Sequence, residues 1–460
     1  METHVKEISV TMKRVTSIAL WFSYFSFGIA NNLLSPLLVE MKNKYETTID
    51  EISNVFIVVL LAYLSGALTC GILFNYFNRQ LMVVGLSCIM ATGVFSIPHV
   101  PTETLFFVIA GVIGFTAGGF DTSQTVWMLE MWRGEAGVYI QAQFFFYALG
   151  STVAPLLLKP FLLEESKDKN ITLETSFPDS FPTTMPSSVS NSTGESQLYI
   201  PLSISGSIIT LGASSILFLF CFDKYVPPTQ GQSEETEVNQ EYISRDDTGS
   251  IAKLFTKMRN LEWDKIALAG QLALIVGFYQ GMENCTFQFM PTFTHYTDLA
   301  FPEPDGAAVL SGMTGAYTAG RLAGILITYY NVSPALILIF NLVLATTGNI
   351  ILLIFANSNV TLLWTGAVLL GLGYSTVFAC IFDYIEKHLK ITNLIGASNA
   401  VVGGLVSAVY PLIVGDSVER KPLVLMYVIF FGLSMCTIMF SSIYYMTVIR
   451  KRVSNPQVGF

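Results

Sequence analysis

The sequence predicts an all-α membrane protein whose twelve spans form two six-helix pseudo-repeats. Three observations predict this fold. Of the 460 residues, 52% are apolar and only 12% are charged, whereas a soluble domain carries about 25% charged residues. The apolar residues fall in runs of ~20, a length that crosses ~30 Å of hydrocarbon as a helix. A long polar segment separates six of these runs from six more.

Charge clusters and turn residues bound the twelve apolar segments. These are residues 16–38, 52–74, 81–98, 104–128, 137–160, 200–222, 264–290, 306–329, 334–356, 361–382, 392–414 and 422–447. The predicted parts of the chain are an N-terminus (1–15), a first half (16–222) with a loop at 161–199, a linker (223–263), a second half (264–447) and a tail (448–460).

The positions of Lys and Arg predict the orientation. With the N-terminus inside, sixteen of the 24 basic residues lie on the cytoplasmic side and seven outside, while Arg321 lies within a span. Short cytoplasmic loops are enriched in Lys and Arg, so both termini and the linker are expected in the cytoplasm. The loop at 161–199 then lies outside, where its sequons predict glycosylation of Asn170 and Asn191. We expect a multi-pass, monomeric protein of the plasma membrane.

Several classes of function are disfavoured. The net charge of −9 argues against nucleic acid as a partner. The six cysteines have no metal-ligand spacing, and the chain contains no Gly-x-Ser-x-Gly, HExxH, P-loop or dinucleotide motif. We therefore expect no enzyme activity and no cofactor. The lipid bilayer is the expected surrounding, and any transport would be driven by a gradient.

An internal repeat supports duplication of a six-span unit. The segment Gly71–Asn78 closes the second span, and Gly324–Asn331 closes the eighth, with five of eight residues identical. The two segments occupy equivalent places in the two halves. Duplication of this kind is common in transporters.

The six-plus-six pattern with this motif resembles the major facilitator superfamily. In that family the loop after the second span reads Gly-x-x-x-Asp-Arg-x-Gly-Arg-Arg/Lys. This chain keeps Gly71 and Arg79 but has Asn75 in the region of the acid. The resemblance implies the major facilitator fold, and the departure weakens the charge-relay form of the motif.

Other segments resemble the sodium-dependent glucose transporter branch, which is related to the fucose permeases. They lie at 28–40, 121–142, 279–283, 320–322, 383–386 and 411–415. This resemblance implies a secondary active transporter of a hexose-like sugar, with glucose as the first candidate. It also implies symport by alternating access, with Na⁺ favoured over H⁺ as the coupling ion.

Three charged residues lie well inside the spans, away from their ends, namely Asp121, Glu283 and Arg321. A charge at mid-bilayer costs from about 3 to more than 10 kcal/mol, so these side chains are not expected to face lipid. Our hypothesis is that Asp121 binds the coupling cation or proton, with Arg321 near enough to tune it, and that Glu283 is a second coupling carboxylate. The alternative is a permanent ion pair that holds the two halves together.

A sugar needs many hydrogen-bond partners beside an apolar ring face. The predicted substrate-binding residues are polar residues of spans one, four, five, seven and eight: Asn31, Asn32, Gln124, Gln141, Gln143, Gln280, Asn284 and Arg321. For each amide, an interhelical hydrogen bond is the alternative. Pro36, Pro155 and Pro411 are candidate positions for helix breaks near the cavity.

Two other functions remain open. A carrier for another small polar or anionic solute is one, because Arg321 suits a carboxylate. A membrane sensor or scaffold that transports nothing is the other. In that case the acidic segment at 230–247 would be the output surface.

Overall fold

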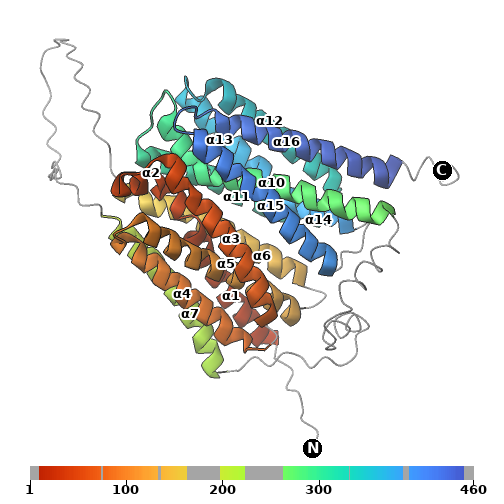
Figure 1. Cartoon of the computed structure of the whole chain (residues 1–460). Helices are drawn as coiled ribbons and strands as arrows, with labels where there is room; N and C mark the ends of the chain where they lie inside the picture. The colour runs from red at the N-terminus through yellow and green to blue at the C-terminus, as the bar shows by residue number, and fades with distance from the viewer. Residues whose placement is uncertain are drawn as a thin grey trace, which may run out of the picture.

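A computed structural model of the chain describes residues 10–73, 76–132, 136–162, 197–222, 263–330, 332–386 and 393–449, and the regular structure in these ranges is helical. Residues 163–196 of the predicted loop 161–199, with Asn170 and Asn191, and the acidic segment 230–247 lie outside the described residues. Figure 1 shows the first half in red to yellow-green beside the second half in green to blue, with the long helices running side by side.

The first half contains six membrane-crossing units. They are α1 (Val10–Asn31) with α2 (Leu34–Tyr45), α3 (Ile49–Leu73), α4 (Arg79–Ser96), α5 (Glu103–Trp132), α6 (Ala136–Leu158) and α7 (Tyr199–Phe222). Short 3₁₀ turns follow α4 (Ile97–His99) and α6 (Lys159–Phe161).

The second half repeats this plan. Its units are α10 (Trp263–Tyr296), α11 (Glu303–Tyr329), α12 (Pro334–Phe355), α13 (Val360–Tyr374) with α14 (Val377–Glu386), α15 (Asn393–Ser417) and α16 (Val424–Tyr444), followed by a π turn (Tyr445–Ile449). The repeated motif ends α3 in one half and α11 in the other, as the sequence predicted.

Equivalent helices have equivalent neighbours in the two halves. In the first half α3 packs on α5 and α1 packs on α6; in the second half α11 packs on α13 and α10 packs on α15. The same pairing in both halves is what duplication of one unit produces. The predicted fold, two six-helix pseudo-repeats of an all-α membrane protein, is confirmed.

Eight of the described helical segments are long and apolar enough to cross a membrane by length and composition. Helices α1, α10 and α11 are not among them, although their lengths suffice, and of α15 only Val402–Ser417 counts, as a shorter apolar helix. These three helices carry Asn31, Glu283 and Arg321. Each of these three helices thus carries a predicted site residue, although Asp121 lies on α5, which is among the eight.

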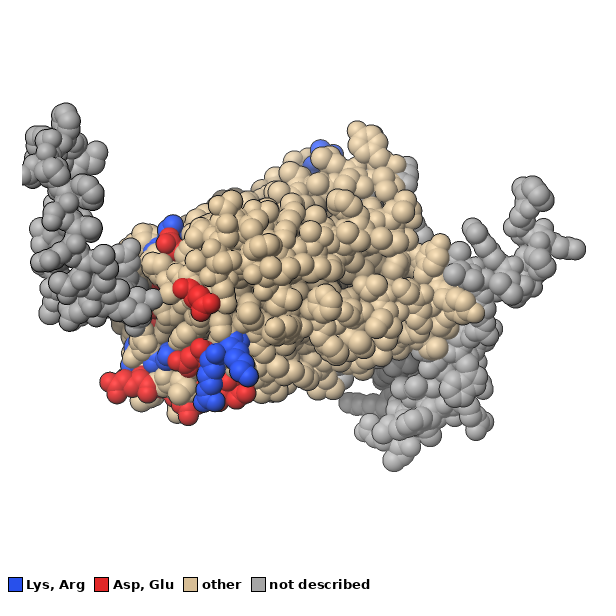
Figure 2. All heavy atoms as spheres, turned by 90° about the horizontal axis from the view of Figure 1, so that it is seen from above, with Lys and Arg blue, Asp and Glu red and all other residues tan. Residues whose placement is uncertain are grey.

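The bundle has two ends. The Lys42 end contains Tyr45, His99, Phe161, Tyr296 and Ser417, where α2, α10, α15 and the 3₁₀ turns finish. The Val10 end contains Leu73, Trp132, Phe222, Tyr329 and Glu386. Figure 2 shows charged side chains gathered mainly at one end of a surface that is otherwise uncharged on the face in view. Large apolar side chains such as Phe340 and Leu68, 63% and 57% exposed, cover the flanks, where lipid would contact them.

Two helical units are broken in mid-course. Residues 32 and 33 separate α1 from α2, and Ser35 at the break donates to the carbonyl oxygens of Phe287 and Gln288 in α10. Of the three prolines expected near breaks, Pro36 alone lies close to one, since Pro155 and Pro411 are inside continuous helices. The gap at residues 375 and 376, between α13 and α14, was not predicted.

Candidate transport site

Asp121 lies on α5 and is bonded by two tyrosines from other helices. Tyr24 of α1 donates its hydroxyl to one carboxylate oxygen, and Tyr63 of α3 donates to the other. Within the described residues, no ion pair includes Asp121. The carboxylate is thus held by neutral donors, and its charge has no basic partner.

A glycine allows Tyr63 to reach Asp121. Gly118 lies about one turn before Asp121 on α5, and a Cβ at this position would overlap the carbonyl oxygen of Tyr63. The two backbones therefore approach more closely than any side chain would permit. This approach brings α3 near enough for its tyrosine to bond to the carboxylate.

A chain of contacts links Asp121 with the break after α1. The ring of Tyr24 lies 6.1 Å from the ring of Tyr147 in α6. Asn31 donates its side-chain amide to the Tyr147 hydroxyl at 2.7 Å, and Asn31 is itself exposed. The predicted cation site and a predicted substrate-binding amide are thus two aromatic side chains apart.

Glu283 forms a second cluster, in α10. The Tyr279 hydroxyl lies 2.7 Å from Glu283 Oε1 and 2.6 Å from the carbonyl oxygen of Tyr374. Tyr374 ends α13 at the unpredicted helix break, where carbonyl groups lack helical partners. A tyrosine has one hydroxyl hydrogen and can satisfy only one of these two oxygens. A proton on Glu283 would satisfy both contacts, because Glu283 would then donate to Tyr279 and Tyr279 to Tyr374.

Arg321 belongs to this second cluster. Its guanidinium donates to the Tyr317 hydroxyl and, at 3.2 Å, to the carbonyl oxygen of Phe144 in the first half. It also lies over the rings of Tyr317 and Phe144, at 4.5 and 5.6 Å. The carboxylate whose charge acts on Arg321 is Glu283. The structure thus places Arg321 with Glu283 and does not show the ion pair between Asp121 and Arg321 that the alternative requires.

The predicted amides fall into two groups. Gln124 donates to the carbonyl oxygen of Leu20, Gln143 to Thr125 at 3.1 Å, and Asn32 to Ser151 at 2.8 Å. These three are buried and bond neighbouring helices together. The amides that retain exposed surface are Asn31, Gln141, Gln280 and Asn284. A ligand could reach this second group from the surface, although Asn31 also bonds α1 to Tyr147 of α6.

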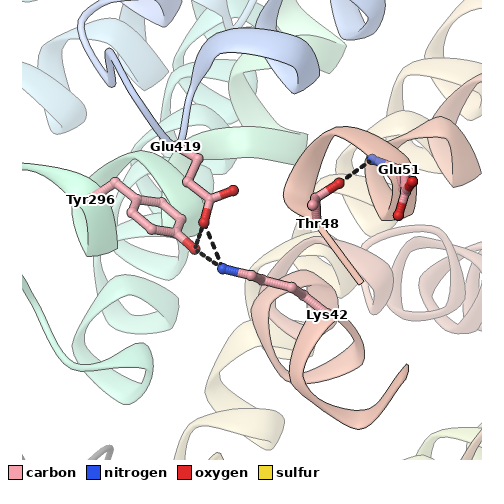
Figure 3. Close-up of polar contacts among 5 residues, drawn as sticks. All are labelled: Lys42, Thr48, Glu51, Tyr296 and Glu419. Carbon is pink, nitrogen blue, oxygen red and sulfur yellow. Dashed lines mark hydrogen bonds and ion pairs between the residues drawn. The ribbon is translucent and has the colours of Figure 1, made fainter. Parts of the chain in front are cut away.

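A third polar cluster lies at the Lys42 end, away from both carboxylates in the spans. Lys42 Nζ lies 2.7 Å from Glu419 Oε1 and 2.9 Å from the Tyr296 hydroxyl (Figure 3). Burial alone would lower the pKa of Lys42, but the bonds to Glu419 and Tyr296 outweigh it and raise that pKa. Burial alone would likewise raise the pKa of Glu419, but the bond from Lys42 outweighs it and lowers that pKa.

Sequence reasoning missed several residues of these clusters. Tyr63, Tyr374 and Phe144 were not predicted, nor were Lys42 and Glu419 of the third cluster. A tyrosine within an apolar span, such as Tyr63, was the available signal, because a buried hydroxyl needs a hydrogen-bond partner. Lys42 and Glu419 are 377 positions apart, and no local pattern relates them.

The retained basic residue of the loop motif has a partner from another helix. Arg79, the first residue of α4, bonds to both carboxylate oxygens of Glu130 near the end of α5, at 2.8 and 2.9 Å. Asn75, near the expected place of the acid, lies outside the described residues. Glu130 therefore supplies the acid that the motif lacks.

Comparison with known proteins agrees with this architecture. A family model described as Major Facilitator Superfamily matches residues 20–164 and 196–411. The chain is 26% identical over 433 residues to sodium-dependent glucose transporter 1 of Danio rerio, covering 93% of this chain and 68% of the relative. It is 25% identical to major facilitator superfamily domain-containing protein 4B of Danio rerio, covering 88% and 81% of the two chains.

Solved structures share the fold at low identity. A nucleoside transporter, NupG, superposes with a TM-score of 0.62 at 12% identity, covering 95% of this chain and 99% of that chain. A bacterial homologue of the human lysosomal transporter Spinster, in an inward-facing and unoccupied conformation, superposes with a TM-score of 0.60 at 11% identity, covering 96% of each chain. The fold, the repeat and the extent of the family match agree, and the chain belongs to the Major Facilitator Superfamily.

Proposed function

We propose that this transporter carries a neutral, hexose-like sugar, with glucose as the first candidate, in symport with a cation. Na⁺ is the favoured coupling ion and H⁺ the alternative. The observation that carries the proposal is Asp121, a carboxylate among the spans that accepts bonds from Tyr24 and Tyr63 and has no ion pair within the described residues. A lone charge there is costly, and a bound cation removes that cost.

Coupling requires that the cation and the sugar act on each other. Asp121 is bonded to Tyr24, whose ring contacts Tyr147, which in turn bonds to Asn31. Neutralising Asp121 would change the hydrogen bond that Tyr24 donates to it. The packing of Tyr24 against Tyr147, which bonds to Asn31, would change as a consequence. Asn31, Gln141, Gln280 and Asn284 are the proposed sugar-binding amides, because they retain exposed surface.

Glu283 is proposed as the second coupling carboxylate. Tyr279 lies within bonding distance of both Glu283 and the Tyr374 carbonyl group at the end of α13. A charged Glu283 would take the only hydroxyl hydrogen of Tyr279 and leave the carbonyl group without it. Protonation of Glu283 would therefore favour the arrangement at this helix break. While Glu283 is charged, it offsets the charge of Arg321, which supports a neutral solute.

The orientation follows from the positive-inside count. We propose that the Lys42 end faces the outside of the plasma membrane and that both termini and the linker at 223–263 are cytoplasmic, between halves at 16–222 and 264–447. Asn170 and Asn191 are then the proposed glycosylation sites in the outer loop. A monomer is the proposed functional unit.

The test uses the purified full chain in sealed vesicles. Na⁺ and pH gradients are imposed separately, and accumulation of labelled glucose is measured for the wild type and for Asp121→Asn, with the exposed Asp298→Asn as the matched control. We expect accumulation with the wild type and with the control, and sugar exchange without accumulation with Asp121→Asn. No flux under either gradient would contradict the proposal.

A carrier for an anionic solute is the second candidate. One observation favours it: Arg321 Nε is buried and has no hydrogen-bond partner. A labelled monocarboxylate in the same vesicles separates the two, since only an anion carrier would accumulate it. A sensor or scaffold would show no flux of either solute and would depend on the acidic segment at 230–247.

A further inference from the structure

We propose that Glu419 is a releasable latch that joins the two halves at the Lys42 end. Its carboxylate enters a positively charged socket, defined here as the ammonium group of Lys42 together with the backbone N–H of Ile49 at the start of α3. Lys42 and Ile49 belong to the first half, and Glu419 follows α15 in the second half. The latch favours the state in which the Lys42 end is closed.

The charged groups of the socket and of Glu419 are within bonding distance of each other. Glu419 Oε1 lies 2.7 Å from Lys42 Nζ and 3.5 Å from the Tyr296 hydroxyl (Figure 3). Tyr296, from the end of α10 in the second half, also contacts Lys42, so that the ammonium group lies between two oxygen atoms of the other half. The backbone N–H of Ile49 acts on the same carboxylate and, after Lys42, lowers the pKa of Glu419.

The two residues just before α3, Thr47 and Thr48, bond to Glu51 in the first turn of that helix. Thr48 accepts the backbone N–H of Glu51 at 3.2 Å (Figure 3). Thr47 donates to the Glu51 carboxylate at 2.5 Å. The first half thus caps part of its own helix, and the Glu419 carboxylate of the other half lies near the N–H of its first residue. The N-terminus of a helix carries a partial positive charge, which a carboxylate stabilises.

The strength of the latch suits a contact that breaks in each transport cycle. The side chains of Lys42 and Glu419 are 22% and 37% exposed, so solvent screens part of their attraction. A second ion pair between the halves, Lys159 with Asp305, has the same polarity but is longer, at 3.7 Å, and more exposed, at 41% and 50%. Of these two ion pairs, Lys42 with Glu419 therefore contributes more of the charge attraction between the halves.

This inference goes beyond the proposed function, because it requires only that the carrier alternates between states. It is tested without solute or coupling ion. Spin labels are attached at Asn43→Cys in the first half and Asp298→Cys in the second, both exposed positions at the Lys42 end. The exposed Cys88 and Cys221 are replaced by serine. Pulsed electron paramagnetic resonance then measures the distance distribution in the full chain in lipid nanodiscs.

We expect Glu419→Gln to raise the ratio of long to short distances by up to about fivefold, the scale for a partly exposed ion pair. Lys42→Gln should act in the same direction from the other half. Asp416→Asn removes the same charge from an exposed position three residues away and should leave the distribution unchanged. An unchanged distribution in both Glu419→Gln and Lys42→Gln, with the wild-type melting temperature, would overturn the latch.

A charge swap tests the contribution of α3. The double variant Lys42→Glu with Glu419→Lys restores an ion pair but places an ammonium group against the N-terminus of α3, which disfavours positive charge. We expect the swap to recover only part of the closed population. Complete recovery would overturn the role of α3 in the socket.

Discussion

Lys42 and Glu419 lie 377 positions apart in the sequence, and their side chains form an ion pair of 2.7 Å between the two halves. The pair lies at the Lys42 end of the bundle, where α2, α10 and α15 finish, and both side chains are partly exposed. Its ionisation therefore follows ordinary rules for a partly buried surface pair, and its dependence on pH can be derived.

The latch should be insensitive to pH over a wide range. The pKa of Glu419 is lowered from its usual 4.5. The stabilisation of the closed state by its charge is therefore complete above about pH 4.5 and is lost as pH falls through the lowered value. The pKa of Lys42 is raised from its usual 10.5. The stabilisation of the closed state by its charge is therefore complete below about pH 10.5 and is lost as pH rises through the raised value. We expect the open-to-closed ratio of the wild type, relative to Glu419→Gln, to stay constant between these limits.

Spin-label distances recorded at several pH values measure this ratio. Other titratable groups lie nearby: His295 packs its ring against Tyr296, and Glu40 acts on Lys44. Both are present in the wild type and in Glu419→Gln, so comparison of the two proteins removes their effect. A change in the relative ratio between about pH 7 and about pH 9 would show that the pair does not act as a charged unit there.

The bonds to Asp121 should set the affinity for the coupling ion. Tyr63→Phe removes one hydroxyl donor from the carboxylate, and a hydrogen bond to a charged group contributes about 1.5–3 kcal/mol. We expect the half-saturating cation concentration for sugar uptake to change by about tenfold or more. Tyr45→Phe is the matched control, because the Tyr45 hydroxyl bonds only to the Val100 carbonyl group at the Lys42 end among the described contacts. Equal cation dependence in the two variants would contradict the role of Tyr63.

Part of this site could be predicted from the sequence, and part could not. Asp121 was identifiable because charged residues are rare in apolar runs. Its partners Tyr24 and Tyr63 come from two other helices, and which face of each helix meets α5 depends on packing that no local pattern contains. For the same reason the sequence could not separate Gln124, which bonds α5 to α1, from Asn31, which retains exposed surface.

The helix breaks show the same limit. Pro36 marks the region of the break after α1, whereas Pro155 and Pro411 are accommodated inside helices. The break after Tyr374 has no proline. It is recognisable only in three dimensions, where Tyr279 bonds to the Tyr374 carbonyl group. The periodicity of apolar residues predicts where a helix lies, but the partners of its freed carbonyl groups come from elsewhere in the chain.

Glu283 and Tyr279 should respond differently to substitution. In Glu283→Gln the amide can donate to Tyr279, and Tyr279 can still donate to Tyr374, so the arrangement of a protonated carboxyl is kept. We expect sugar exchange to persist and its dependence on pH to weaken. Tyr279→Phe leaves the Tyr374 carbonyl oxygen without this donor and Glu283 without this partner, at a cost of about 1–3 kcal/mol, and should lower exchange and stability together. Exchange assays and thermal unfolding of both variants measure this, and a larger defect in Glu283→Gln than in Tyr279→Phe would contradict it.

The close approach of α3 and α5 should be essential for the site. Gly118→Ala adds a methyl group that overlaps the carbonyl oxygen of Tyr63, and backbone atoms cannot rotate away as a side chain can. The helices must then separate, which costs about 1–3 kcal/mol and draws the Tyr63 hydroxyl away from Asp121. We expect a lower melting temperature and an altered cation dependence of uptake in the direction of Tyr63→Phe.

Gly85→Ala is the matched control for this substitution. Gly85 lies inside α4, and nothing lies within 4 Å of a Cβ built there. Alanine favours a helix over glycine by about 1 kcal/mol, so Gly85→Ala should keep or raise the melting temperature and leave cation dependence unchanged. If Gly118→Ala behaved like Gly85→Ala in both measurements, the packing of α3 on α5 would not be what holds Tyr63 against Asp121. Of the two tyrosines, Tyr24 would then be the one that fixes the position of the Asp121 carboxylate.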